Sequence, residues 1–114
     1  MNENFVKSIY KTLVEDGKEI YRDLYDNTKV TEGTVDYWKN ALELYHSFDD
    51  KQKDVFMNIV KQTIIDTISS VFGVLDGSST LSGEDYEFEV RINGISTEDE
   101  LQDTFLGFVE DNIN

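Results

Sequence analysis

The sequence contains no cysteine and no proline, and only one histidine in 114 residues. Without cysteine, disulfide bonds, thiolate metal sites and thiol catalysis are all excluded. A zinc site is disfavoured too, because His46 would have only carboxylates to complete it. The first residues lack the apolar core of a secretion signal, and no stretch approaches the roughly 18 apolar residues of a membrane span. We therefore expect a cytoplasmic protein that contacts no membrane.

Basic residues are scarce and unevenly placed along the chain. The net charge is −14. Residues 1–61 carry 12 acids and 9 lysines or arginines, whereas residues 62–114 carry 12 acids and Arg91 alone. Such a field repels nucleic acid and attracts basic proteins. The alternative is that the acidity only keeps the protein soluble.

Aromatic residues are abundant, with seven Phe, six Tyr and one Trp. A chain of this length and composition is expected to form a single compact domain over residues 1–114. Apolar residues from Phe5 to Tyr25 share one arc at about 100° per residue, which predicts a long helix over 3–26. Gly17 lies within this arc and is expected to allow a neighbouring element to approach closely. A break of the helix at Gly17 is the alternative.

Two further helices are predicted between the first helix and Gly77. Thr34 is the expected N-cap of a helix over 35–47. Asp49 and Gln52 then form a capping box that opens the longest apolar segment. Gly77 is expected to end that segment, since glycine commonly terminates helices.

The helix that ends at Gly77 is apolar nearly all round in its second half. Only one row is polar or small, namely Gln62, Asp66, Ser69, Ser70 and Gly73. So narrow a stripe predicts a central helix that other elements cover on most sides. Asp66 is the one acid of the row, and it either faces water or is partly buried.

Residues 86–92 alternate between apolar and charged side chains, which predicts a half-buried antiparallel strand. Its expected partner is the short segment 78–81, with 82–85 as the hairpin loop. A two-stranded sheet is marginal alone and leaves one strand edge unpaired. We therefore expect the edge of strand 86–92 to pair between chains, in a homodimer or with a strand of a target protein.

Asn93-Gly94 is predicted to turn the chain once more before a last helix over 98–111. Thr97 and Glu100 form the expected capping box of this helix. Its inward residues are expected to be Leu101, Phe105, Phe108 and Val109. The predicted fold is thus α+β and predominantly α, with three helices, a short β-hairpin and a C-terminal helix.

A calcium loop starting at Asp76 is the sharpest ligand hypothesis for the glycine- and serine-rich segment before the predicted strand. Ser78, Thr80 and Glu87 fall at ligand positions, but Leu81 stands where the sharp turn of such a loop requires glycine. A strand follows instead of a helix. The hairpin interpretation is therefore preferred, and no metal or other cofactor is expected.

Catalysis has few candidate residues. His46 lies on the polar face near the end of the second helix, where a solvated role beside the helix C-terminus is expected. With Asp66 it is the first residue to test for acid–base chemistry. The chain has no phosphate-binding glycine loop, nucleophile elbow or zinc-protease motif. We therefore expect no enzyme activity.

The preferred hypothesis is a small acidic binding protein for a basic protein partner. Its sharpest form is an inhibitor or immunity protein for a nucleic-acid-cleaving toxin, whose cationic cleft the carboxylates would fill. The alternative is a structural or homo-oligomeric protein whose acidity serves solubility. The expected partner-binding residues are Glu84, Asp85, Glu87, Glu89, Glu98, Asp99 and Asp103.

Overall fold

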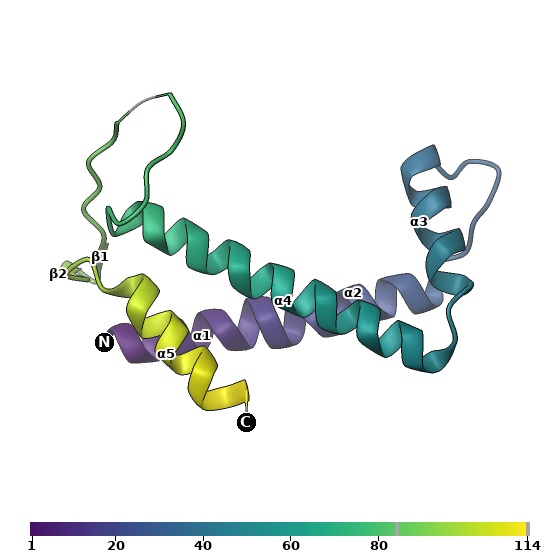
Figure 1. The fold of residues 1–114 in the computed structure, drawn as a ribbon, viewed down its shortest axis with the longest axis horizontal. Helices are drawn as coiled ribbons and strands as arrows, with labels where there is room; N and C mark the ends of the chain where they lie inside the picture. The colour runs from purple at the N-terminus through teal and green to yellow at the C-terminus, as the bar shows by residue number, and fades with distance from the viewer. Residues whose placement is uncertain (84, 114) are drawn as a thin grey trace.

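The computed structural model describes residues 1–83 and 85–113, except for the side chain of Ile113. Figure 1 shows a predominantly helical chain with one small antiparallel hairpin, which confirms the predicted α+β class. The elements are α1 (Asn2–Ile9), the π-helical segment η1 (Tyr10–Glu15), α2 (Asp16–Asn27), α3 (Asp36–His46), α4 (Asp50–Leu75), β1 (Arg91–Ile92), β2 (Ile95–Ser96) and α5 (Leu101–Ile113).

The first three elements form one unbroken helical rod, as the apolar arc predicted (Figure 1). The helix passes through Gly17 without a break. Gly17 faces α4, where a Cβ built on it would lie 3.8 Å from Cδ1 of Ile64. This is an ordinary van der Waals distance, so the approach of α4 is less close than we expected.

The ends of α3 and α4 show which capping signals are used. The predicted N-cap of α3 was wrong by one residue, because Val35 occupies that position and Thr34 Oγ1 accepts the Thr31 amide instead (2.9 Å). The capping box of α4 is confirmed, with Asp49 and Gln52 exchanging hydrogen bonds of 2.8 and 3.0 Å. Gly77, with φ 83°, ends α4 as predicted.

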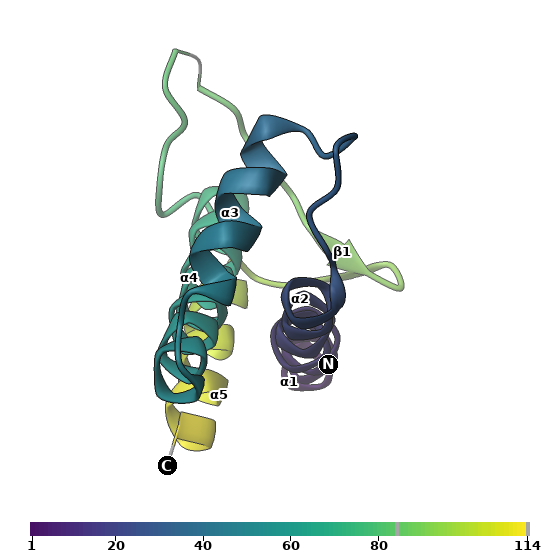
Figure 2. The ribbon, with the colours of Figure 1, turned by 90° about the vertical axis from the view of Figure 1, so that its right-hand side faces the viewer.

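Two separate hydrophobic clusters hold the helices together. The larger joins α1, η1, the second half of α4 and α5 around Val6, Tyr10, Val14, Ile65, Phe72, Leu101, Phe105 and Val109. The smaller joins the end of α2, α3 and the first half of α4 around Tyr25, Leu42, Tyr45 and Met57. Figure 2 shows the rod beside the α4–α5 layer. The radius of gyration is 17.6 Å, larger than the value of about 13 Å for a compact domain of this length. The molecule is therefore elongated.

Helix α4 is not covered on most sides, which corrects the sequence prediction. In the second half of the helix, on which the prediction rested, Val71 is 51% exposed, and in the first half Val55 and Ile59 are 52% and 62% exposed. The polar row from Gln62 to Gly73 was expected to face solvent, but part of it contacts another helix. Ser69 and Gly73 are buried against α5. A Cβ on Gly73 would lie only 2.7 Å from Nε2 of Gln102. Small residues here admit α5, and part of the apolar surface of α4 remains uncovered.

The predicted strand 86–92 and its partner 78–81 were wrong except at one end. Arg91 pairs with Ser96 and Ile92 pairs with Ile95, so the hairpin closes around Asn93-Gly94. Both turn residues have positive φ, at 52° and 81°, as a two-residue turn of the Asn-Gly type requires. Residues 86–90 lie outside the strands, and the edge expected for pairing between chains shrinks to two residues.

Helix α5 begins at Leu101, three residues later than predicted. Glu98 and Asp99 have φ of 56° and 55°, which no right-handed helix contains. The predicted capping box of Thr97 and Glu100 does not form, because the buried Thr97 hydroxyl donates to the carbonyl of Val90. The inward side of the helix is confirmed: Leu101, Phe105 and Val109 are buried and Phe108 is half-buried.

Candidate functional site

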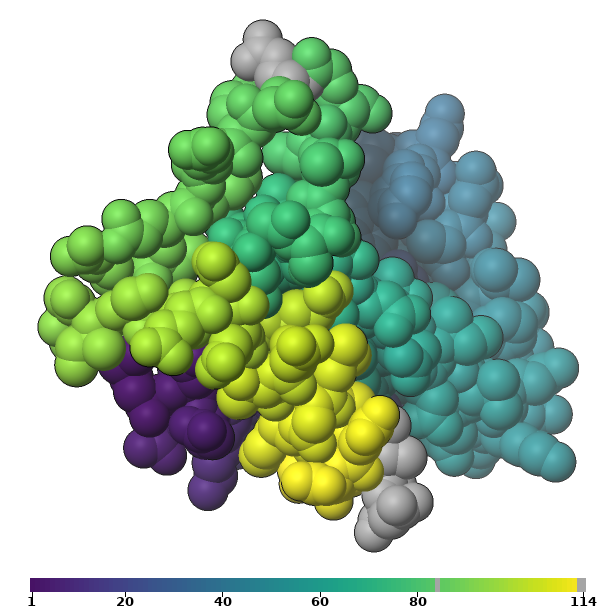
Figure 3. Space-filling model, turned by 60° about the vertical axis from the view of Figure 1, so that its left-hand side comes forward, coloured from purple at the N-terminus to yellow at the C-terminus, as the bar shows by residue number. Residues whose placement is uncertain are grey.

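The predicted partner-binding acids that the structure describes lie on the connection between α4 and α5, except Asp103, which lies in the first turn of α5. All those that the structure describes are exposed: Asp85, Glu87, Glu89, Glu98, Asp99 and Asp103. Glu84 lies outside the described residues. Figure 3 shows the connection projecting at the top and the hairpin standing beside α5. We call residues 85–103 the acidic segment.

Hydrogen bonds close the connection between α4 and α5 at its base and again across the hairpin. The carboxylate of Asp76, at the end of α4, accepts the amides of Leu101 (3.2 Å) and Gln102 (2.7 Å) at the start of α5. The carbonyl of Val90 accepts the amide and the hydroxyl of Thr97, at 3.0 and 3.2 Å. An acid at the end of one helix thus caps the next helix and closes the loop between them.

The one cation of residues 62–114 is used within the acidic segment. Arg91 donates from Nε and Nη2 to Oε1 of Glu89, at 2.7 and 2.5 Å. Both side chains are more than half exposed, so the pair adds little stability. It neutralises one carboxylate. The other acids of the segment form no ion pair within the described residues.

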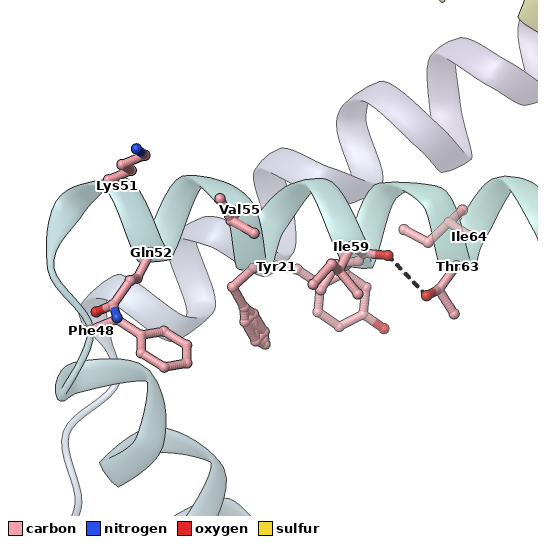
Figure 4. Close-up of a pocket in the computed structure, with 10 residues that line it drawn as sticks. Tyr21, Phe48, Lys51, Gln52, Val55, Ile59, Thr63 and Ile64 are labelled. Atoms are coloured by element: carbon pink, nitrogen blue, oxygen red, sulfur yellow. Dashed lines mark hydrogen bonds between the residues drawn. The ribbon is translucent and has the colours of Figure 1, made fainter.

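An apolar groove that the sequence pattern did not predict lies where α2 and α4 cross. This hollow has a volume of about 720 Å³ and lies between the two hydrophobic clusters. Figure 4 shows Val55 and Ile59 on α4 above Tyr21, with Phe48 at one end. Phe56 and Ile64 complete the apolar wall. A second hollow of about 380 Å³ continues along α4 past Asp66.

The catalytic candidates do not form a site. His46 ends α3, and its Nε2 lies 2.9 Å from the carbonyl of Tyr25, which ties α3 to α2. The expected solvated position is therefore only part of its role. Asp66 is exposed on α4, and its carboxylate accepts a hydrogen bond from the side-chain Nε2 of Gln62 (2.9 Å). In the described part of the chain, no group of histidine, aspartate and glutamate side chains could hold a metal ion.

Tyr45 is a perturbed titratable group that packs among the helices. Burial raises the pKa of Tyr45 to about 12, and its hydrogen bond to the Asp26 carboxylate (2.5 Å) adds to the shift. Arg22 joins this network through Asp26 and through Asp54, at 3.7 and 2.7 Å. The network links α2, α3 and α4 around the smaller hydrophobic cluster.

Comparison of the chain with protein-family models, curated proteins and solved structures gave no match. None of the helices in residues 1–83 and 85–113 has the length and apolar character needed to cross a bilayer. The two distinctive surfaces of the molecule are the acidic segment and the apolar groove.

Proposed function

We propose that this chain is a non-catalytic binding protein that recognises a basic protein partner through the acidic segment. The observation that supports the proposal most is the exposure of six described carboxylates, five on the connection between α4 and α5 and one, Asp103, in the first turn of α5. Hydrogen bonds hold the base of this connection. A segment held in place loses less conformational entropy on binding than a free tail. The surrounding negative field accelerates the encounter with a cationic surface.

The kind of partner is inferred from the sign of the charge and the number of exposed carboxylates. Enzymes that cleave nucleic acids bind phosphates in a cationic cleft, and a row of carboxylates can occupy such a cleft. An inhibitor or immunity protein for a nucleic-acid-cleaving toxin is the most specific form of the proposal. We place it in the cytoplasm, as the composition led us to expect.

The test compares two variants that change the net charge equally. In the first, Asp85, Glu87 and Glu89 are replaced by lysine. In the control, Glu19 and two other exposed acids of the first half, Glu32 and Glu43, are replaced by lysine. Binding of a short oligolysine peptide is measured by calorimetry at low and at physiological salt.

We expect the first variant to lose most of the binding and the control to keep most of it. Both variants should keep the far-UV circular dichroism of the native protein, because exposed acids contribute little to folding. Equal losses in the two variants would show that only the net charge matters. That result would favour the alternative in which the acidity serves solubility.

A further inference from the structure

The apolar groove carries an inference that goes beyond the proposed function. Its wall is concave, yet Val55 and Ile59 project from the same face, 52% and 62% exposed. Figure 4 shows these two side chains on α4 at the rim of the hollow. A surface that contains both a projection and a hollow can fit a second copy of itself across a two-fold axis.

The charge around the groove also suits a second copy. Between residues 48 and 64 the acids and lysines balance, with Asp49, Asp50 and Asp54 against Lys51, Lys53 and Lys61. The chain as a whole carries −14. Two such chains repel each other over most of their surfaces, and this face is where they can meet without that repulsion. A basic partner would instead be drawn toward the acidic segment.

The ends of the α4 face are complementary under a two-fold axis. Lys51 lines the groove and Asp66 lines the hollow that continues from it. They are fifteen residues apart, about 22 Å along a helix, and lie within about 60° of each other around it. The midpoint between Lys51 and Asp66 along the helix falls beside Ile59. An antiparallel pair of α4 helices centred there places Lys51 of each copy against Asp66 of the other.

The same arrangement keeps the acidic segments apart. Each segment follows the end of α4 at Leu75, about 24 Å along the helix from Ile59. In an antiparallel pair the two α4 ends, from which the connections to the acidic segments start, therefore lie about 48 Å from each other. This distance is several times the screening length of about 8 Å at physiological salt, so their mutual repulsion is small.

We propose that two copies of this chain associate through the apolar groove, with their α4 helices antiparallel. The dimer would cover Val55 and Ile59 and bury the groove between the two clusters of each copy. It would also present two acidic segments at opposite ends. The association does not require the edge of strand 86–92, which the sequence had indicated as the dimer contact.

Sedimentation velocity from micromolar to millimolar protein tests the proposal. The native chain should pass from monomer to dimer as concentration rises. Ile59→Asp should raise the dissociation constant by about thirtyfold or more, as expected of a central contact residue. Leu44→Asp is the matched control, because Leu44 is 58% exposed on α3 away from the groove. Circular dichroism checks that both variants fold.

A charge exchange tests the antiparallel register. Lys51→Asp and Asp66→Lys should each weaken the dimer by about two- to fivefold, and the double variant should restore native affinity. A monomeric mass at every concentration would overturn the proposal. So would a dimer that is indifferent to Ile59→Asp, which would move the contact to another surface such as the hairpin edge. Failure of the double variant to restore affinity would overturn the antiparallel pairing.

Discussion

The cap that Asp76 provides to α5 leads to a quantitative stability prediction. Its carboxylate accepts two of the backbone N–H groups that the first turn of α5 leaves without a helical partner. Replacing an N-cap acid by alanine costs about 0.5–2 kcal/mol. Asp76 also ends α4, where a negative charge is unfavourable by about 0.3–1 kcal/mol. The two effects oppose each other, so we expect Asp76→Ala to destabilise the protein by about 0.6 kcal/mol.

Urea unfolding followed by far-UV circular dichroism measures this loss, together with hydrogen exchange of the α5 amides. Exchange at Leu101 and Gln102 should accelerate, because both amides lose their acceptor. Asp76→Asn should cost less, since its amide oxygen still accepts one of the two N–H groups and the charge at the end of α4 is gone. Asp103→Ala is the control, as Asp103 is an exposed acid in the same first turn. Exchange at Leu101 and Gln102 that is as slow in Asp76→Ala as in Asp103→Ala would refute the cap.

Three further predictions concern the packing of the helices. Gly17→Ala should stabilise the protein by about 0.5–1 kcal/mol in thermal unfolding, because the added methyl group would only touch Ile64. Gly17→Leu should instead destabilise the protein by about 1–3 kcal/mol through overpacking. Phe105→Ala should cost about 3–5 kcal/mol, since Phe105 is fully buried between α1 and α4. The folded protein holds the Tyr45 proton more tightly than the unfolded chain, because the pKa of Tyr45 is raised to about 12. This difference adds about 2–3 kcal/mol to the free energy of unfolding. The added stability should be complete below pH about 10 and be lost as the pH rises from there to about 12. Tyr45→Phe should flatten that alkaline decline in denaturation curves.

The helical part of the fold could be predicted because its signals are local. The apolar arc of the first helix, the capping box at Asp49 and Gln52 and the stop at Gly77 each lie within a few residues of what they determine. The pairing at Asn93-Gly94 was equally local, since this dipeptide specifies a two-residue hairpin turn. We interpreted this dipeptide only as a further turn, and we assigned the hairpin strand to the longer alternating pattern of residues 86–92 before it.

The remaining features depend on contacts between distant residues. Asp76 caps a helix that starts 25 residues later, and no local pattern announces such a bond. Ser69 and Gly73 fit a solvent-facing stripe as well as a close helix contact until the position of α5 is known. For the groove the only local signal was an excess of apolar residues, such as Val55 and Ile59, on one helix. The acidic segment was visible in composition, but its fixed base was not.

The most direct measurement of the proposed function is an NMR titration of the uniformly labelled protein with a short oligolysine peptide. If the acidic segment is the binding surface, the largest amide shifts should fall within residues 85–103 and at Asp76, which closes its base. They should fade as salt is raised, because the contacts are ionic. Shifts spread evenly over the 12 acids of residues 1–61, or no shifts at all, would contradict the proposal.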